Sequence, residues 1–138
     1  MGMMEENTRG KFELYYPIRD EVITRQLYLG DFDTLFEFSD GRRVLYDELS
    51  DRIRDIYPRD KSYLDKEEWT KEFSRKLYKK MCLKGVSQKE LADNIGISNT
   101  AMSRLINGKC NVDVYLVQRI AAYLNCSVTE LTNFDYLL

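Results

Sequence analysis

Hydrophobic residues follow two different periods along the chain, and the period changes near residue 65. The stretches Val22 to Leu29 and Thr34 to Phe38 are rich in β-branched and aromatic residues, which is typical of β-strands. From Trp69 onward, apolar residues recur every three or four positions, which is typical of helices that bury one face. The pattern therefore predicts a protein of the α+β class, with strands in the N-terminal half and helices in the C-terminal half.

A turn signal joins the second predicted strand to a third. Asp40-Gly41 follows Phe38, and Asp-Gly favours a two-residue hairpin turn in which both residues take positive φ. In the register that such a loop imposes, Phe36 faces Leu45. The sequence predicts a β-hairpin at this point.

The next stretch, YDELSDRIRDIYP, has a helical pattern. Leu49, Ile53 and Ile56 share one helical face, and Pro58 ends the pattern. Residues 1–65 therefore read as a small β-meander of about three strands plus one helix, and they close with the polar linker PRDKSYLD. A unit of this size is too small to be robust alone, so we expect it to pack on the helical half or on a second copy of itself.

Capping signals divide residues 66–138 into helices. Asp65-Lys-Glu-Glu68 has the form of a capping box and opens a helix that Gly85 ends. Ser87-Gln-Lys-Glu90 and Ser127-Val-Thr-Glu130 are two further capping boxes. The apolar stripe of the first helix is formed by Trp69, Phe73, Leu77 and Met81.

Shorter helices follow the first one. Gly96 ends the second helix, Ser98 caps a third that Gly108 closes, and a fourth begins near Val112. With the last helix, which starts after Ser127, the segment is expected to form a compact five-helix bundle. The apolar stripe expected for the fourth helix is formed by Val114, Val117, Ile120, Ala121 and Leu124.

The second and third of these helices have the spacing of a helix-turn-helix. Two short helices that cross steeply need a small side chain at their closest approach and a residue tolerant of positive φ in the turn. Ala92 and Gly96 stand at these two places. Apolar residues would hold both helices to the core, namely Leu91, Ile95, Ile97, Met102, Leu105 and Ile106. The same residues would also serve an ordinary helical hairpin, so they indicate a fold and not a function.

Residues from about 67 to 134 resemble the lambda-repressor-like, Cro-type helix-turn-helix family, also called the xenobiotic-response-element family. The stretches that carry the resemblance are VSQKELADNIGISNTAMSRLINGK and VDVYLVQRIAAYLNCSVTELT. The second stretch is similar to the fourth helix and the closing turn of that family. The resemblance implies a five-helix DNA-binding domain over residues 66–138, and it leaves residues 1–65 unassigned.

The resemblance also implies that Ser98–Asn107 is a recognition helix that lies in the major groove of double-stranded DNA. Gln88 matches a position that contacts the DNA backbone or braces this helix. Arg104 matches one that meets a phosphate or a guanine, and Lys109 could meet a phosphate. Asn can pair in bidentate fashion with adenine, and Ser and Thr can bond to any base or to phosphate. The positions implied to reach bases are Ser98, Asn99, Thr100, Ser103 and Asn107.

Several of these candidates have an alternative interpretation. Arg104 can form an intramolecular ion pair or pack its stem, and Lys109 can be an ordinary solvated lysine. The basic run of the first C-terminal helix is most often a solvated face, or it flanks the DNA backbone; it comprises Arg75, Lys76, Lys79, Lys80 and Lys84. Tyrosines of the N-terminal half are expected to be core or dimer contacts and not ligand stackers, for example Tyr15, Tyr16, Tyr28 and Tyr46.

Charge divides the chain at the same place as the hydrophobic pattern. The net charge is −2, but residues 1–65 carry 10 Lys and Arg against 15 Asp and Glu, whereas residues 66–138 carry 11 against 8. The excess of cations in the second half favours a polyanion as its partner. The recognition helix holds one cation, Arg104, so a monomer would bind DNA weakly and a dimer would double the contacts. The N-terminal meander is the candidate dimerisation element.

Other function classes lack the residues that they need. The chain has no histidine, and Cys82, Cys110 and Cys126 form no CxxC pair, so neither a zinc site nor a disulfide framework is suggested. Without a glycine-rich phosphate loop or a catalytic constellation, we expect no enzyme, cofactor or metal. No apolar run approaches the roughly 18 residues of a membrane span and the N-terminus has no signal core, so we expect a cytoplasmic protein without a membrane partner.

These observations predict a sequence-specific DNA-binding transcriptional regulator of bacterial or phage type, which acts as a homodimer. The acidic excess in residues 1–65 keeps a second hypothesis open. In this alternative the chain is an antitoxin or a phage regulatory adaptor, and it acts mainly through a protein partner of its N-terminal half.

Overall fold

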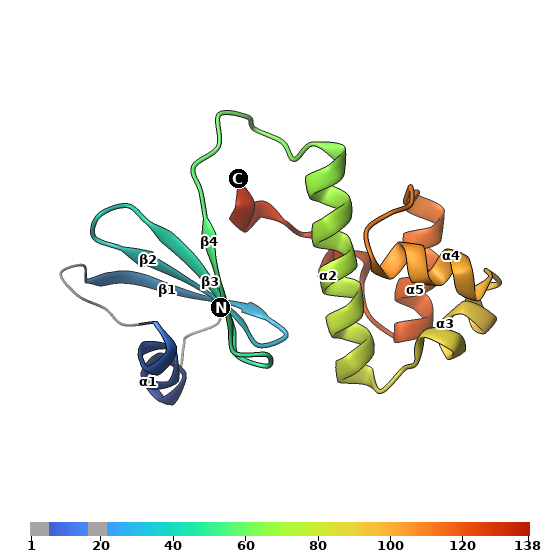
Figure 1. Ribbon diagram of the computed structural model, residues 1–138, viewed down its shortest axis with the longest axis horizontal. Coiled ribbons are helices and arrows are strands. Elements are labelled where there is room, and N and C mark those ends of the chain that lie inside the picture. The colour runs from blue at the N-terminus through green and yellow to red at the C-terminus, as the bar shows by residue number, and fades with distance from the viewer. Residues whose placement is uncertain (1–5, 17–21) are drawn as a thin grey trace. The chain divides into compact units, whose positions relative to one another are not determined.

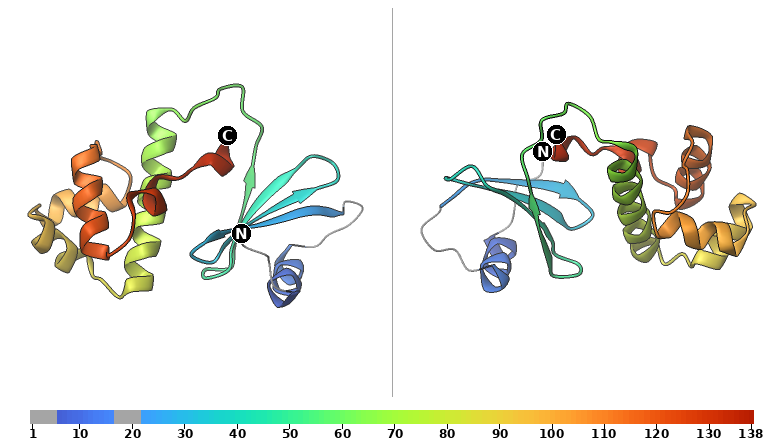
Figure 2. Two further views of the ribbon diagram at one scale, coloured as in Figure 1. Left: turned by 180° about the vertical axis from the view of Figure 1, so that it is seen from behind. Right: turned by 45° about the horizontal axis from the view of Figure 1, so that its top comes forward.

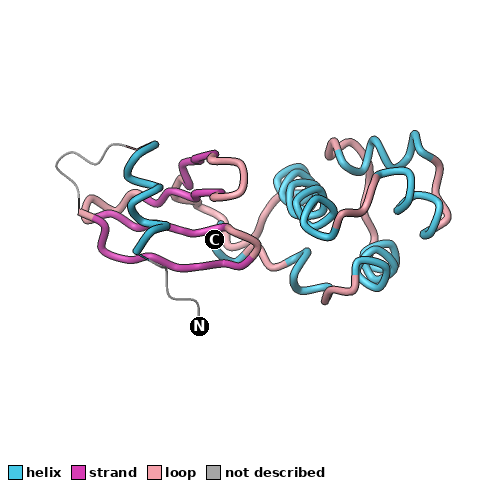
Figure 3. Tube along the Cα trace, turned by 90° about the horizontal axis from the view of Figure 1, so that it is seen from below, coloured by secondary structure: helices cyan, strands magenta, loops and turns pink. Residues whose placement is uncertain are grey.

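The chain divides into two units, and the described part of the first, Met1–Asp60, contains four antiparallel strands and one helix. The computed structural model describes residues 6–16 and 22–138. The sheet has the order β1-β2-β3-β4, and α1 lies across one of its faces (Figures 1 and 3). The expected α+β class with a small N-terminal meander is confirmed, and the meander has four strands where about three were predicted. The elements are α1 (Glu6–Tyr15), β1 (Ile23–Gly30), β2 (Asp33–Phe38), β3 (Arg43–Asp47) and β4 (Arg52–Ile56).

Alternation along the strands places large side chains on the face of the sheet that α1 covers. Phe36 and Phe38 of β2 and Val44 and Tyr46 of β3 share this face and are buried. Phe12 of α1 is fully buried and stacks on Phe36, with the ring centroids 3.8 Å apart. Aromatic rings bury a large apolar area each, so a few of them supply a core for this small unit.

The tyrosines singled out from the sequence have different environments. Tyr46 is fully buried and its hydroxyl donates to Asp51, and Tyr16 stacks on Phe12 at the edge of the core. Tyr28 is exposed, which excludes it from the core of this unit. The side chain of Tyr15 lies outside the described residues.

The hairpin between β2 and β3 is present, but its expected register was wrong by one residue. Its loop has three residues and is closed by a hydrogen bond of 3.0 Å from the Gly41 N–H to the Phe38 carbonyl. Gly41 alone in this loop has a positive φ, +88°, as is usual for the third residue of such a loop. Phe36 therefore lies opposite Val44 and not opposite Leu45. This matters because a one-residue change of register moves a side chain to the other face of the sheet.

The two-residue turn with two positive φ angles occurs instead between β1 and β2. Gly30 pairs with Asp33, and the two residues between them, Asp31 and Phe32, have φ values of +51° and +63°. Glycine, asparagine and aspartate dominate such turns, so Phe32 is unusual there. The Phe32 carbonyl accepts a hydrogen bond of 2.9 Å from the Glu48 N–H, which ties this turn to the end of β3.

Residues 52–56 form β4, so the helix predicted over YDELSDRIRDIYP was wrong. Asp51 has a positive φ of +56°, and Ile53 then lies opposite Tyr46 of β3. Leu49, which the helical pattern placed on an apolar face, is exposed. The edge of β3 that does not face β2 has backbone N–H and C=O groups that need partners. Pairing of residues 52–56 with this edge outweighs the weak helix preference of these residues. The helix of this unit is α1, in a stretch for which the sequence predicted none.

The second unit, Lys61–Leu138, consists of helices (Figures 1 and 2). The five helices expected for this half are confirmed, and a short 3-10 turn follows them. The helices α3 and α4, drawn in yellow and orange, contact each other, and α3 also packs with α5 while α4 packs with α2 (Figure 2). The elements are α2 (Lys66–Lys84), α3 (Gln88–Ile95), α4 (Asn99–Ile106), α5 (Val114–Leu124), α6 (Val128–Thr132) and η1 (Asp135–Leu137).

Local capping interactions set most of the helix ends. The Asp65 carboxylate accepts from the Glu68 N–H at 2.9 Å, and the Glu68 carboxylate accepts from the Asp65 N–H at 3.2 Å, so the predicted capping box is confirmed. The same reciprocal pair joins Ser127 and Glu130 at the start of α6. At the other end of α2, Gly85 takes the left-handed conformation with φ +67°.

Two details of the expected helices were wrong. Ser87 caps α3 by accepting from the Glu90 N–H, but the Glu90 carboxylate does not return to Ser87, because it accepts from the Tyr123 hydroxyl of α5. Val114, expected on the buried stripe of α5, is 71% exposed. Asp113 is the cap of α5, so Val114 stands in the first turn, before the buried period that begins at Val117.

The core of the second unit lies between α2 and the four shorter helices. All four residues of the predicted α2 stripe belong to it, with Trp69 partly buried at its edge. Within residues 6–16 and 22–138, no helix has both the length and the apolar character to cross a membrane. The same described residues bring together no group of three or more His, Cys, Asp or Glu side chains that could hold a metal ion.

Candidate nucleic-acid interface

A tight turn joins α3 to α4. Gly96 has φ +76°, and the N–H groups of Gly96 and Ile97 both donate to the Ala92 carbonyl at 3.0 Å. The Ala92 side chain is fully buried in the core that α3 and α4 share. The residues that the sequence assigned to the crossing and the turn of a helix-turn-helix therefore stand at these places.

Buried apolar side chains fasten both helices to the rest of the unit. Leu91, Ile95, Met102 and Leu105 are each no more than 2% exposed, and Ile97 and Ile106 pack at the edge of the same core. Because one side of α4 is anchored in this way, its opposite side faces solvent in a fixed direction.

A buried hydroxyl that sequence reasoning missed also holds α4. The Ser74 hydroxyl of α2 lies 2.6 Å from the Leu105 carbonyl oxygen and 2.9 Å from the Thr70 carbonyl oxygen, and its single proton is shared between these two acceptors. A Cβ on Gly108, just after α4, would lie 3.5 Å from the Ser74 hydroxyl. A small polar residue inside the buried period of α2 is the signal that could have indicated this contact.

The solvent-facing side of α4 is polar. Ser98, Asn99, Thr100, Arg104 and Asn107 are exposed, and Ser103 is half-buried. The Ser98 hydroxyl accepts from the Ala101 N–H at 3.0 Å, so this side chain is the cap of α4. Among the described residues, the structure gives no hydrogen bond to the side chains of Asn99 and Thr100, which leaves their polar groups available to a ligand.

Two of the candidates at the end of α4 also make contacts inside the chain. Arg104 donates through Nη2 to the Lys109 carbonyl at 3.2 Å, and Asn107 donates through Nδ2 to the Ser103 carbonyl at 2.8 Å. The Arg104 bond joins α4 to the loop that follows it, an intramolecular role that differs from the ion pair considered from the sequence. Arg104 has further N–H donors, since a guanidinium carries five in all.

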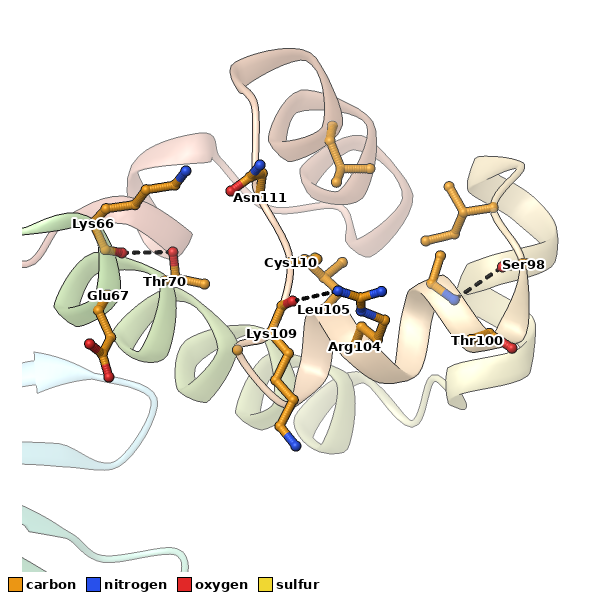
Figure 4. A pocket seen from close by; sticks show the side chains of 14 residues that line it. Lys66, Glu67, Thr70, Ser98, Thr100, Arg104, Leu105, Lys109, Cys110 and Asn111 are labelled. Atoms are coloured by element: carbon orange, nitrogen blue, oxygen red, sulfur yellow. Dashed lines mark hydrogen bonds between the residues drawn. The ribbon is translucent and has the colours of Figure 1, made fainter.

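An open groove runs beside α4 and is lined by residues of the second unit only (Figure 4). Its volume is about 920 Å³, and its walls are the first turn of α2, one side of α4 and the loop 108–111. Three cations line it, Lys66, Arg104 and Lys109, against the single carboxylate of Glu67. Lys66 was not among the residues singled out from the sequence, because only the fold brings the start of α2 next to this loop.

The groove also holds a cysteine. Burial raises the pKa of the Cys110 thiol above its usual value, and the nearby charge of Arg104 partly opposes this effect. The thiol is therefore protonated at neutral pH, and it adds no charge to the apolar part of the groove lining. The other apolar residues that line the groove are Ile97, Ala101, Leu105 and Leu116.

The basic run of α2 is partly engaged within the second unit. Arg75 pairs with Glu72 at 2.9 Å, Lys76 lies over the Tyr136 ring at 5.2 Å, and the Lys80 ammonium is 3.6 Å from the Glu130 carboxylate. Arg75 also donates to the Tyr136 hydroxyl at 3.3 Å, so these three side chains connect α2 to the C-terminal segment of the same unit. Gln88 is exposed at the first position of α3, and Lys109 is exposed after α4.

Comparison with known proteins supports the geometry of α3 and α4. A family model described as "Helix-turn-helix" (HTH_3) matches residues 77–131, which include α3, α4 and α5. Among curated proteins, no sequence matches this chain.

Solved structures similar to part of this chain include three bacterial proteins. The restriction-modification controller protein C.AhdI from Aeromonas hydrophila is 26% identical over 45% of this chain and 94% of its own, with a TM-score of 0.43. The hypothetical transcription factor NHTF from Neisseria is 21% identical over 54% of this chain and 86% of its own, with a TM-score of 0.45. An HTH_3 family transcriptional regulator from Vibrio cholerae is 19% identical over 53% of this chain and 42% of its own, with a TM-score of 0.48.

The family match and the observed turn agree on the same residues. Ala92, Gly96 and the anchored pair of short helices all lie within the matched segment 77–131. The match supports a DNA-binding regulator, and it identifies residues 77–131 of the second unit as a helix-turn-helix segment.

Proposed function

We propose that this chain is a transcriptional regulator of bacterial or phage type that reads a DNA sequence with α4 in the major groove. The observation that carries the proposal is the two-sided character of α4. One side is anchored by Met102 and Leu105, and the other presents Asn99 and Thr100 to solvent. A helix whose exposed side chains can donate and accept hydrogen bonds suits base edges, where each base pair shows its own pattern of donors and acceptors.

The six polar residues of the α4 segment would have different roles at the DNA. Asn99 and Thr100 are the primary base readers in this proposal, because no hydrogen bond joins their side chains to another described residue. Ser98 and Ser103 have hydroxyl groups that can still donate to DNA, and the carbonyl oxygen of the Asn107 amide can still accept. Arg104 would use its remaining N–H groups on a phosphate or a guanine.

The DNA backbone would be held from both sides of α4. Gln88 begins α3, where the free N–H groups of a helix N-terminus favour a phosphate. Lys109 and Lys66 line the groove on the other side, and their charges would follow the DNA strand beyond the recognition helix. The three cations Arg104, Lys109 and Lys66 make a modest electrostatic contribution for one copy.

A homodimer would double these contacts and would require half-sites about one helical turn apart. The N-terminal sheet is the proposed dimerisation element, because within its unit β1 and β4 are edge strands. Antiparallel self-pairing of β4 about Arg54 would place two Arg54 side chains opposite each other, which is unfavourable. In β1, pairing about Gln26 places Arg25 opposite Leu27, so β1 is the better edge for a second copy.

The test begins with selection of bound sequences from a random pool of DNA duplexes. We expect an enriched motif with two-fold symmetry. Asn99→Ala should then weaken binding to the selected duplex by about 1–3 kcal/mol, the usual value of one base contact. Gln118→Ala, which removes an amide from an exposed position on α5, is the matched control and should leave the affinity unchanged.

Two results would count against the proposal. An unchanged affinity of the Asn99→Ala protein would remove this residue from the reading role. Failure of any motif to enrich, with only weak and steeply salt-dependent retention of DNA, would leave the fold without the function.

The acidic N-terminal half supports a second candidate function. Residues 1–65 carry an excess of five carboxylates over cations, which suits a basic surface on a protein partner. In this alternative the chain is an antitoxin or regulatory adaptor. Purification of the tag-free protein from its host tests it, because recovery without a stoichiometric protein partner would contradict it.

A further inference from the structure

Helix α5 holds both ends of α3 with two side chains that stand one turn apart. Arg119 donates through Nη2 to the carbonyl of Ile95, the last residue of α3. Tyr123 donates through its hydroxyl to the Glu90 carboxylate in the first turn of α3. These bonds connect the first helix of the helix-turn-helix to a helix outside the motif.

The Arg119 contact lies at the turn itself. The last carbonyls of a helix have no partner within the helix and carry partial negative charge, so a guanidinium is favoured there. A Cβ on Gly96 would lie 3.4 Å from the Arg119 guanidinium, so this side chain lies directly beside the turn glycine. The guanidinium also lies over the Tyr115 ring, 5.5 Å from its centroid. The carbonyl and the ring together fix the orientation of the Arg119 side chain.

The direction of α4 depends on the end of α3, because the connection between them is short. Only Gly96, Ile97 and Ser98 separate the two helices, and the N–H groups of Gly96 and Ile97 are bonded back to α3. A change at the Ile95 carbonyl is therefore passed to the start of α4, where Asn99 and Thr100 stand.

We propose that Arg119 is a positioning residue for DNA reading, although it makes no contact with a base. It sets the angle between α3 and α4 by holding the Ile95 carbonyl, and the bond between Tyr123 and Glu90 holds the other end of α3. This inference rests on the proposed function, since it assigns a role in presenting Asn99 and Thr100 to base edges. The site is the α3–α4 turn, and the ligand is the DNA duplex that α4 reads.

The test compares Arg119→Lys with Leu131→Ala in the full chain. Lysine keeps the positive charge but lacks the planar group that bonds a carbonyl and stacks on a ring at once. Leu131 is a fully buried residue of α6, which packs against α2 and α5, so we expect its truncation to lower stability without altering the α3–α4 turn. Binding is measured well below both melting temperatures, on the selected duplex and on a scrambled duplex at the same salt.

We expect Arg119→Lys to weaken binding to the selected duplex by about tenfold, the equivalent of one base contact, and to change binding to the scrambled duplex by less than about twofold. Leu131→Ala should weaken neither. An equal loss on both duplexes would overturn the proposal, because it would make Arg119 a contact to the DNA backbone. Unchanged binding by Arg119→Lys, or equal effects of both variants, would also overturn it and leave Arg119 with a structural role alone.

A second readout separates failure of this inference from failure of the proposed function. Backbone amide chemical shifts of Ile97, Asn99 and Thr100 report the turn without any DNA. We expect Arg119→Lys to move these shifts more than Leu131→Ala does. If the wild-type protein selects no sequence, the proposed function fails whatever the shifts are. If it selects a sequence but the shifts of these residues stay unchanged in Arg119→Lys, the positioning role fails alone.

Discussion

At the residue scale, Phe32 stands where the backbone favours glycine. Its φ of +63° is in the left-handed region, which costs a residue with a Cβ about 1–2 kcal/mol relative to glycine. The bond from Glu48 to the Phe32 carbonyl involves only the backbone, so it survives a change of side chain. We therefore expect Phe32→Gly to be more stable than Phe32→Ala by about 1 kcal/mol, measured as the free energy of unfolding in urea.

The comparison with alanine makes this prediction specific to the backbone. Both variants lose the same ring, and only the alanine variant keeps the strain of the left-handed conformation. Equal free energies of unfolding for the two variants would show that the turn relaxes to another conformation once the phenylalanine is gone.

Gly96 is subject to a backbone constraint and a side-chain constraint at the same scale. Its φ of +76° favours glycine, and the Arg119 guanidinium lies beside it, 3.4 Å from where a Cβ would stand. The sequence indicated the first constraint through the spacing of Ala92 and Gly96. It did not indicate the second, because Arg119 comes from a helix that begins 18 residues later in the numbering, at Val114.

At the element scale, the Ser74 hydroxyl joins α2 to the end of α4. The bond to the Leu105 carbonyl is buried, so its loss would leave that oxygen with only the weaker bond of 3.2 Å from the Gly108 N–H. We expect Ser74→Ala to lower the free energy of unfolding by about 1–2 kcal/mol, measured by chemical denaturation.

Thr132 offers the matched control for Ser74. Its hydroxyl donates only to the carbonyl of Val128, within its own helix and near the surface. Thr132→Ala should therefore change stability by less than about 0.5 kcal/mol. A Ser74→Ala protein as stable as the Thr132→Ala protein would mean that the contact between α2 and α4 does not contribute.

A second contact between elements makes stability depend on alkaline pH. Burial, together with the charge of Glu72, raises the pKa of the Tyr136 hydroxyl above its usual 10.0. The neutral hydroxyl donates to the Glu72 carboxylate and accepts from Arg75, which joins η1 to α2. Because the folded pKa is raised, this stabilisation is fully present below the ordinary tyrosine pKa and is lost as the pH rises above it.

The predicted outcome is a difference between two pH profiles. Between about pH 9 and pH 11, the melting temperature of the wild type should fall more steeply than that of Tyr136→Phe, which has no proton to lose at this position. Lysines and the other tyrosines titrate in both proteins, so the difference isolates Tyr136. Parallel profiles would contradict the coupling between η1 and α2.

At the scale of the whole molecule, DNA affinity should depend on a small number of cations. Each phosphate contact releases about one counterion, so Lys109→Ala should reduce the slope of log K against log salt by about 1 per bound copy. Lys84→Ala is the control, because Lys84 lies at the opposite end of α2 from the groove residue Lys66. A slope unaffected by Lys109→Ala would place this lysine among ordinary solvated residues.

What the sequence by itself determined is mostly local. Asp65, Gly85 and Gly96 act on backbone groups within a few residues, so helix ends could be placed from their neighbours alone. The polar surface of α4 was also readable, because the period of its apolar residues defines which side is anchored. These features sufficed to identify the helix-turn-helix and the exposed candidates Asn99 and Thr100.

The tertiary structure decided whatever depends on partners far along the chain. Residues 52–56 have a pattern compatible with a helix, but they form a strand. The reason is that the backbone N–H and C=O groups along the free edge of β3 pair with them. The Glu90 carboxylate does not complete the predicted capping box, because it accepts from the hydroxyl of Tyr123, 33 residues away. The groove cation Lys66, the buried Ser74 and the turn contact of Arg119 also depend on residues that are distant in the sequence. Their roles follow from which elements pack together, and no local pattern of residue types records that packing.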